Sequence, residues 1–200
     1  MTPRPDVSEM RTAQIIEAAT VVFAEKGFDG ATMDDIADEI GINKATIYLY
    51  FDSKDALIRA IAEEIFAQEL ADLQAAYESP GTATERLTVY YETLIADESE
   101  IRPLMPLLYE FYARGLRRED VRLVIADFIH HLIGLLKAII QDGIDSGEFV
   151  PTDARQAARA LDALLSGTLL HWVYVPEKVD VAAQLRYGVR LIFRGLVNHP

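Results

Sequence analysis

The stretch GINKATIYLYF, residues 41–51, contains three hydrogen-bonding side chains, those of Lys44, Thr46 and Tyr48, that a short helix could present to a partner. Lys44 supplies an ammonium group, and Thr46 and Tyr48 supply hydroxyl groups. Such groups bind a partner together only when they share an exposed surface. In a strand, successive side chains alternate between two faces, whereas in a helix residues three or four apart share a face. The secondary structure of this segment therefore decides what these side chains can do.

Two other groups of polar side chains could support chemistry. Asp127 and His131 are four residues apart, but two ligands on one helix are not a metal site, and a third, such as His171, would have to come from elsewhere. Glu63 and Glu64 are adjacent and diverge on a helix, which suits surface charge better than acid–base catalysis. The sequence has no nucleophile-elbow, phosphate-loop or zinc-protease motif. We expect no enzymatic activity, no metal and no cofactor.

Helix signals on both sides of residues 41–51 favour a helix over a strand, although IYLYF alone has strand propensity. Gly41 can end the preceding helix and Ser53 can cap the following one. A helix over KATIYLYF, capped by Asn43, buries Ile47 and Phe51. The opposite side then carries Ala45 and Leu49, flanked by Lys44 and Tyr48 on one edge and by Thr46 and Tyr50 on the other.

The segment before it, TMDDIADEI, predicts a short partner helix. Thr32 and Asp35 have the spacing of a capping box. Ala37 is small where the second helix must approach the third, and Gly41 follows four residues later at the tight turn. Two short capped helices with this spacing are typical of a helix-turn-helix, which makes DNA the expected partner of Lys44 and its neighbours.

The composition limits how such a protein binds DNA. The chain has 200 residues, no cysteine and a net charge of −13. Residues 1–55 hold five Lys and Arg against eleven Asp and Glu. DNA binding must therefore come from a local patch, since a general affinity for nucleic acid needs a basic footprint. No uninterrupted apolar run of 18 residues and no signal peptide are present, so we expect a cytoplasmic protein without a membrane span.

Residues 12–58 resemble the N-terminal DNA-binding domain of the TetR family of bacterial transcriptional repressors, most closely at ATMDDIADEIGINKATIYLYFDSKDAL. The resemblance implies a helix-turn-helix DNA-binding domain over residues 1–54 and a helical ligand-binding and dimerisation domain over residues 55–200. Helix breaks at residues 79–82, 97–103, 117–120, 145–153 and 175–180 predict five further helices. We thus expect an all-α fold of about nine helices.

The resemblance also implies roles for single residues. Free N–H groups at the start of the second helix favour a phosphate. The recognition helix enters the major groove, where Lys44 can bond guanine or a phosphate and Ala45 can touch a thymine methyl group. Hydroxyl and ammonium groups around it can bind phosphates. The expected DNA-binding residues are Thr32, Met33, Lys44, Ala45, Thr46, Tyr48, Leu49, Tyr50 and Lys54.

Aromatic residues concentrate in the middle helices, where they could line a ligand pocket or form ordinary core. The expected pocket residues are Met105, Tyr109, Tyr112, Phe128 and Trp172. The expected effector is an unknown small organic molecule of apolar or amphipathic character. A cation is an alternative, because rings and acids such as Glu92, Glu110 and Asp127 attract positive charge.

One recognition helix reads few bases, so helix-turn-helix proteins usually bind a two-fold site as dimers. The two C-terminal helices are the expected interface, because small residues recur along them at helical spacing. The interface residues are Ala163, Gly167, His171, Gly188, Ile192 and Gly195. Packing of the two helices within one chain is the alternative for the glycines.

These features predict a homodimeric repressor that binds palindromic double-stranded DNA and is released by its effector. The alternative is a helical ligand-binding or scaffolding protein that no longer binds DNA. Acidity and Leu49, which stands where many relatives have a polar or aromatic residue, support the alternative.

Overall fold

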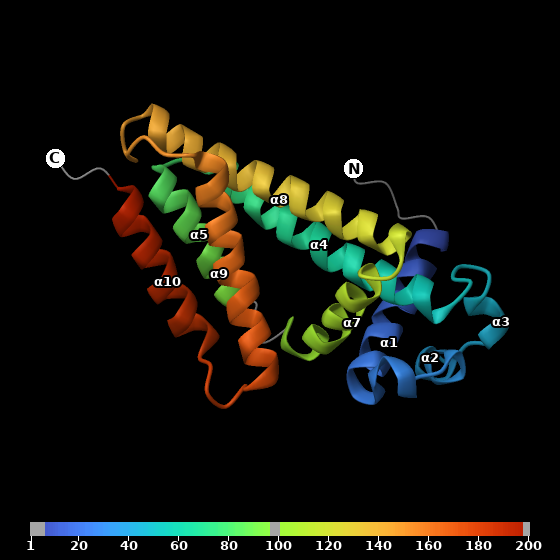
Figure 1. Ribbon diagram of the computed structural model, residues 1–200. Coiled ribbons are helices and arrows are strands. Elements are labelled where there is room, and N and C mark those ends of the chain that lie inside the picture. Colours follow the sequence, from blue (N-terminus) through green and yellow to red (C-terminus); the bar gives the residue numbers. More distant parts are fainter. Residues whose placement is uncertain (1–6, 97–100, 198–200) are drawn as a thin grey trace. The chain divides into compact units, whose positions relative to one another are not determined.

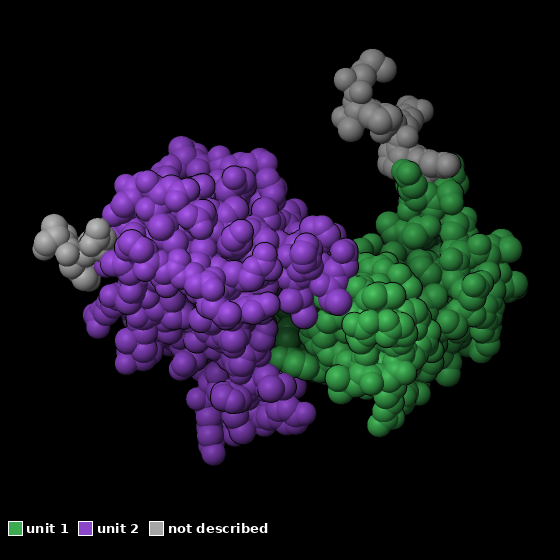
Figure 2. Space-filling view, turned by 45° about the horizontal axis from the view of Figure 1, so that its top comes forward, with its two compact units in different colours: residues 1–66, 100–125 green, residues 67–99, 126–200 purple. Residues whose placement is uncertain are grey.

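The computed structural model describes residues 7–96 and 101–197, and these residues are helical almost throughout (Figure 1). Residues 1–66 with 100–125 form one compact unit and residues 67–99 with 126–200 form another (Figure 2). The described α-helices confirm the all-α fold and the expected number of helices. They are α1 (Val7–Gly30), α2 (Met33–Ile40), α3 (Lys44–Ile47), α4 (Lys54–Glu78), α5 (Ala83–Ala96), α7 (Met105–Gly115), α8 (Glu119–Asp145), α9 (Ala154–Tyr174) and α10 (Val181–Leu196), with a 3₁₀ turn η1 (Arg102–Leu104) before α7.

In the first unit, α1 packs against α2 and α7, and α2 packs against α3. Helix α1 buries the apolar positions that its periodicity predicts, among them Ile15, Ala19 and Phe23. The helix is interrupted at Gly27, where φ is +71°. The chain then returns so that the ring of Phe28 lies 5.4 Å from that of Phe23, measured between centroids.

Local capping sets the bounds of α2 and the start of α3. The Thr32 hydroxyl accepts from Asp35 N–H, and the Asp35 carboxylate accepts from Thr32 N–H, which completes the predicted capping box. Gly41 ends α2 in the left-handed conformation (φ 75°, ψ 37°), where a side chain would be strained. Asn43 Oδ1 then accepts from Ala45 N–H at 2.8 Å and starts α3.

Helix α3 is shorter than predicted, ending at Ile47 rather than continuing to Phe51. After Ile47 the backbone tightens, and Tyr50 N–H donates to the carbonyl of Ile47 three residues back. Such tightening is common in the last turn of a helix, whose carbonyls lack partners four residues on. Tyr48 and Tyr50 therefore lie in a turn that directly follows α3.

In the second unit, α10 packs along α9 and against α5. The Glu148 carboxylate accepts from Ala83 N–H at 2.7 Å and Thr84 N–H at 2.9 Å, so a residue from the loop after α8 caps the start of α5. Arg86 on α5 pairs with Asp142 on α8 at 3.0 Å. The contacts of Glu148 and Arg86 join α5 to α8 and to the loop after it, which are distant in the sequence.

Helix α8 is long and apolar enough to cross a bilayer, the one described helix of which this is true. An 18-residue stretch of it has a mean hydropathy of 1.9, and a third of that stretch is buried inside the protein. A core helix can pass the same test of length and composition. Leu132, Leu136 and Ile139 of α8 are buried.

Candidate DNA-binding surface and sensor sites

The face of α3 and the turn after it present the predicted side chains to solvent. Leu49 is 81% exposed and Tyr48 is 45% exposed, and Ala45 lies on the same open side. Ile47, on the opposite side, is fully buried, whereas Phe51, predicted to be buried with it, is half-buried. Thr46 and Tyr50 are half-buried at the edge. The predicted division into an inner and an outer face is therefore present, although the helix itself is short.

Lys44 is held by an acidic neighbour. Its Nζ lies 2.8 Å from Oδ2 of Asp34, and both side chains are largely exposed. The hydrogen bond from Lys44 to Asp34 raises the pKa of the ammonium group, which stays charged. Asp34 uses one of the three donors of the Lys44 ammonium group, so two remain for a phosphate or a base edge. The carboxylate also places a negative charge beside these donors.

The start of α2 combines hydrogen-bond donors with a carboxylate. Thr32 is exposed and Met33 is buried. The Asp35 carboxylate accepts hydrogen bonds from both the N–H and the hydroxyl group of Thr32. Hydrogen bonds from Lys26 and Thr32 lower the pKa of Asp35 to about 2, so the group is ionised. A phosphate at this helix start would use the remaining N–H groups of the first turn, and Lys26 offsets the charge of Asp35 at 2.7 Å.

Lys54 has a structural role that the sequence did not indicate. Its Nζ donates to the carbonyls of Phe28 and Ala31, each at 2.7 Å, and lies 4.6 Å from the centre of the Phe28 ring. The guanidinium of Arg114 lies 4.0 Å from the centre of the same ring. Two of the three ammonium donors thus tie the start of α4 to the loop between α1 and α2, and one remains for a phosphate.

We expect Lys54→Ala to lower stability as well as DNA affinity. Two charge-assisted hydrogen bonds and a cation–π contact are lost, so unfolding should become easier by about 1–3 kcal/mol. The melting temperature should fall by several degrees, at about 2–4 °C per kcal/mol for a chain of this size. DNA affinity should fall for all sequences, with a shallower salt dependence. Differential scanning calorimetry and salt titrations of DNA binding measure the two effects.

Lys26→Ala is the matched control for Lys54→Ala. It removes an exposed ion pair, which contributes little to stability. If both variants melt like the wild type, the carbonyl contacts of Lys54 contribute nothing measurable.

The predicted pocket residues are divided between the two units. Tyr109 and Tyr112 lie together on α7, with ring centroids 6.0 Å apart, and Tyr112 also meets Phe66 at 6.0 Å. Met105 begins the same helix and is buried. Phe128 on α8 and Trp172 on α9 are buried within the other unit. Each group contributes to the core around it, and their shared role in effector binding stays a prediction.

Acidic residues that suggested a cationic effector already have partners. Glu92 pairs with Arg186 at 2.5 Å, and Glu110 pairs with Arg114 at 3.1 Å. On α8, the carboxylate of Asp127 lies 3.5 Å from His131 Nδ1, which also lies 2.9 Å from the backbone oxygen of Asp127. Within the described ranges, no three His, Asp or Glu side chains gather as a metal site would require.

A buried polar cluster joins α4, α5 and α9 in the second unit. The Tyr90 hydroxyl donates to the Glu69 carboxylate at 2.9 Å, and Tyr91 packs edge-on against Tyr90. Burial raises the pKa of Glu69 to about 7, with smaller contributions from Asp162 and Asp72. Glu69 and Tyr90 are 21 positions apart and Asp162 is further along the chain, so no local pattern could have indicated the cluster.

Glu69 should make stability depend on pH near neutrality. Its pKa rises from 4.5 in the unfolded chain to about 7 in the fold. Between these pH values the folded protein holds a proton that the unfolded chain has released. The stabilisation that results from protonation of Glu69 in the folded protein is fully present below pH 4.5, and it is lost as the pH rises through about 7. We expect a difference of about 1–3 kcal/mol, since one unit of pKa corresponds to about 1.4 kcal/mol and part of the residue is exposed.

Melting curves of Glu69→Gln from pH 5 to pH 8 measure this effect. The amide oxygen can still accept from Tyr90 but does not titrate, so the wild type should lose stability relative to the variant as the pH rises. Glu63→Gln, on the exposed side of α4, should follow the wild type. Parallel curves for Glu69→Gln and the wild type would contradict the assignment.

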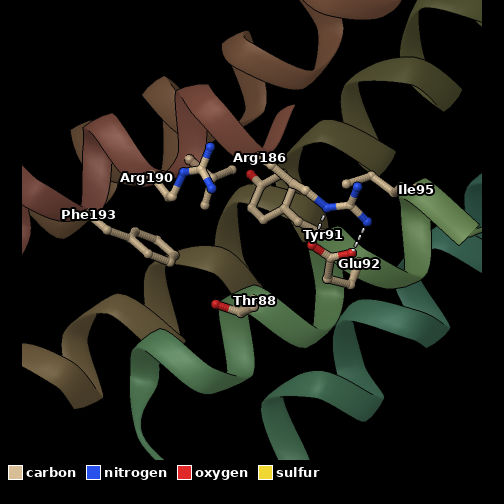
Figure 3. Close-up of a pocket in the computed structure, with 8 residues that line it drawn as sticks. Thr88, Tyr91, Glu92, Ile95, Arg186, Arg190 and Phe193 are labelled. Carbon is tan, nitrogen blue, oxygen red and sulfur yellow. Dashed lines mark hydrogen bonds and ion pairs between the residues drawn. The ribbon is translucent and has the colours of Figure 1, made fainter. Parts of the chain in front are cut away.

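A pocket of about 220 Å³ lies between α5 and α10 in the second unit (Figure 3). Thr88, Tyr91, Glu92 and Ile95 line it from α5, and Arg186, Val189, Arg190 and Phe193 line it from α10. No residue of the predicted pocket set is among them. A side chain from each helix, Glu92 and Arg186, closes one end as an ion pair (Figure 3).

The small residues of α9 and α10 fall into two groups. A side chain at Gly167 or Gly195 would meet nothing within 4 Å, and Ala163 and His171 are exposed. At Gly188, by contrast, a Cβ atom would lie 2.5 Å from a methyl group of Leu164. Gly188 therefore serves packing of α10 on α9 within one chain, the alternative that the sequence left open.

Large exposed apolar side chains lie on the same two helices as the open positions Gly167 and Gly195. Leu170 is 40% exposed, Tyr174 is 78% exposed and Leu191 is 48% exposed. Ile192, the predicted interface residue next to Leu191, is half-buried. The open surface of α9 and α10 is thus apolar and has small residues that allow close approach.

Both parts of the chain match known regulatory proteins. Residues 15–61 match the bacterial regulatory proteins of the tetR family, and residues 83–194 match the C-terminal part of BetI-type transcriptional repressors. The chain belongs to the TetR family. The first match contains every residue of the predicted DNA-binding set, from Thr32 to Lys54. The second extends from α5 into α10.

Individual relatives of this TetR-family regulator agree. The fatty acid metabolism regulator protein of Bacillus subtilis (strain 168) is 27% identical over 189 residues, covering 92% of this chain and 95% of the relative. The crystal structure of the transcriptional regulator FadR from Bacillus subtilis in complex with stearoyl-CoA has a TM-score of 0.75 at 26% identity, covering 92% of this chain and 98% of the other.

A third similarity concerns the fold alone. A transcriptional regulator from Saccharomonospora viridis in complex with choline has a TM-score of 0.84 at 20% identity, covering 95% of this chain and 99% of that one. TetR-family regulators bind DNA, so this chain is a DNA-binding transcriptional regulator with an N-terminal helix-turn-helix.

Proposed function

We propose that this TetR-family regulator is a homodimeric repressor that binds a palindromic operator and leaves it when a small organic effector binds. Residues 1–54 contact DNA, and residues 55–200 bind the effector and dimerise. The regulator works in the cytoplasm and catalyses no reaction of its own. The observation that best supports the proposal is the open face of α3, where Ala45, Tyr48 and Leu49 are exposed on the side opposite the buried Ile47.

The effector class does not follow from the relatives. One related structure contains stearoyl-CoA and another contains choline, and these molecules share neither charge nor size. Relatives of one fold therefore bind chemically unlike molecules, and the effector of this chain must be argued from its own residues.

The test is DNA binding by fluorescence anisotropy, with duplexes from directly upstream of the protein's own gene and scrambled duplexes of equal length. We expect tighter binding to the upstream duplex, two protein chains per palindrome, and affinity that falls steeply with salt. Equal, weak binding to both duplexes would instead favour the helical ligand-binding or scaffolding protein. Exposed Leu49 and the pairing of Lys44 with Asp34 are the features that favour this alternative.

A further inference from the structure

The pocket between α5 and α10 contains a buried hydroxyl group without a partner. Tyr91 is 3% exposed, and its hydroxyl has no hydrogen-bond partner in the part of the chain that the structure describes. Its side chain rises from α5 toward α10, where Arg186 and Arg190 face it (Figure 3). A buried polar group without a partner is unfavourable by itself, and its occurrence at a pocket indicates a ligand.

Tyr91 offers a donor. Burial raises the pKa of its hydroxyl group well above the usual value, so the proton stays on the oxygen. Thr88, on the same helix, already donates its own hydroxyl proton to the carbonyl of Thr84 at 2.7 Å. Tyr91 is therefore the hydroxyl of this pocket that can donate to a ligand oxygen.

The charged side chains that line the pocket leave one positive charge in excess. Arg186 binds Glu92 through two nitrogens, at 2.8 and 2.5 Å, so this pair is neutral as a whole. Arg190 also lines the pocket, and no described carboxylate pairs with it. Its guanidinium can bind two oxygens of one ligand group.

Two acids near Tyr91 do not reverse this balance. Glu69 and Asp162 act on Tyr91 but do not line the pocket. Burial raises the pKa of both, to about 7 for Glu69. A cation in the pocket would meet Arg190 and would find its acid, Glu92, already bound to Arg186.

The rest of the pocket selects a small ligand with an apolar body. Ile95, Val189 and Phe193 supply the apolar side. The volume of about 220 Å³ is below the roughly 300–1,000 Å³ of pockets for drug-sized ligands and equals the liquid volume of roughly seven water molecules. A long acyl chain or a nucleotide does not fit inside it.

We propose that this pocket binds a small organic carboxylate, which accepts a hydrogen bond from Tyr91 and an ion pair from Arg190 and places its short apolar body against Phe193. That this ligand also releases DNA rests on the proposed repressor function. Binding itself does not, because it can be measured without DNA.

Isothermal titration calorimetry with straight-chain carboxylates from acetate to octanoate tests the proposal. We expect binding to be tightest at intermediate length and hexanoate to bind at least about tenfold more tightly than neutral hexanamide, because a hydrogen bond to a charged group is the stronger one. Tyr91→Phe and Arg190→Gln should each weaken hexanoate binding about tenfold or more. Tyr91→Phe removes an atom without a partner, so its melting temperature should equal or exceed that of the wild type.

Two variants on α10 serve as matched controls. Arg194→Gln removes an exposed arginine one turn beyond Arg190, and Tyr187→Phe removes an exposed hydroxyl; neither residue lines this pocket. Both should bind hexanoate like the wild type. The proposal is overturned if no carboxylate binds, if hexanamide or hexylammonium binds as well as hexanoate, or if Tyr91→Phe and Arg190→Gln bind like the controls.

A titration of the upstream duplex, with and without hexanoate, separates this proposal from the repressor function. Hexanoate binding without any DNA binding would support the carboxylate site and contradict the repressor function. Intact DNA binding without any carboxylate binding would support the repressor function and contradict the carboxylate site.

Discussion

Gly167→Glu is expected to turn the protein into a folded monomer that no longer holds its operator. The substitution puts a charge on the open surface of α9, where Ala163 and His171 lie on the same helix. In a two-fold dimer that uses this surface, both copies of the charge meet the interface. Desolvating an unpaired carboxylate costs several kcal/mol, so dimerisation should weaken by more than about 100-fold.

The single chain should tolerate this substitution. A Cβ atom at Gly167 meets nothing within 4 Å, so glutamate displaces no neighbour within the chain. Glutamate also favours a helix interior by several tenths of a kcal/mol relative to glycine. The melting temperature of the monomer, measured apart from the loss of the dimer, should show a cooperative transition, and α2 and α3 should be unaffected.

Light scattering after size-exclusion chromatography and DNA binding by anisotropy measure the two results. Gly134→Glu is the matched control, because Gly134 is an exposed glycine of α8 with equal space around it. That variant should remain dimeric and bind DNA. A folded Gly167→Glu protein that still dimerises would move the interface elsewhere. A wild-type protein that is monomeric yet binds a palindrome tightly would contradict the proposed two-fold dimer.

The parts of the fold that sequence could predict depend on residues close together in the chain. Thr32 and Asp35 cap α2 because they are three residues apart, and Gly41 ends it because its backbone conformation is strained for other residues. Propensity and spacing could also assign Ile47 to the inner face of α3. They could not predict where α3 ends, because the last turn of a helix can form either α-type or 3₁₀-type backbone hydrogen bonds.

Contacts between segments that are distant in the chain could not be predicted from the sequence. Lys54 reaches carbonyls 23 and 26 residues away, and no local pattern distinguishes this from a lysine in solvent. Gly167 and Gly188 look alike in the sequence, and only the position of Leu164 separates an open glycine from a packed one. The unpartnered hydroxyl of Tyr91 likewise depends on which helix faces α5.

Lys44 is the residue of α3 whose loss should cost the most DNA affinity. If it bonds a guanine edge, each copy contributes about 1–3 kcal/mol, so Lys44→Ala should weaken operator binding by roughly 30-fold to 20,000-fold in a dimer. Base preference should relax at the contacted position. If Lys44 bonds a phosphate instead, affinity falls equally for all sequences and the salt dependence becomes shallower. Anisotropy titrations against operators changed at single base pairs distinguish these two cases.

Asp34→Asn should have the opposite effect, because it frees Lys44 and removes a negative charge that faces the DNA. Lys44 and Asp34 are 40% and 65% exposed, so their pairing contributes little to stability, and the fold should not change. We expect operator binding to tighten several-fold, at about 0.2–1 kcal/mol per copy. In the Lys44→Ala background, Asp34→Asn should gain less, since only the repulsion of phosphate remains to be relieved. An equal gain in both backgrounds would show that Asp34 does not compete with DNA for Lys44. Unchanged binding in Lys44→Ala itself would remove this lysine from the DNA contact.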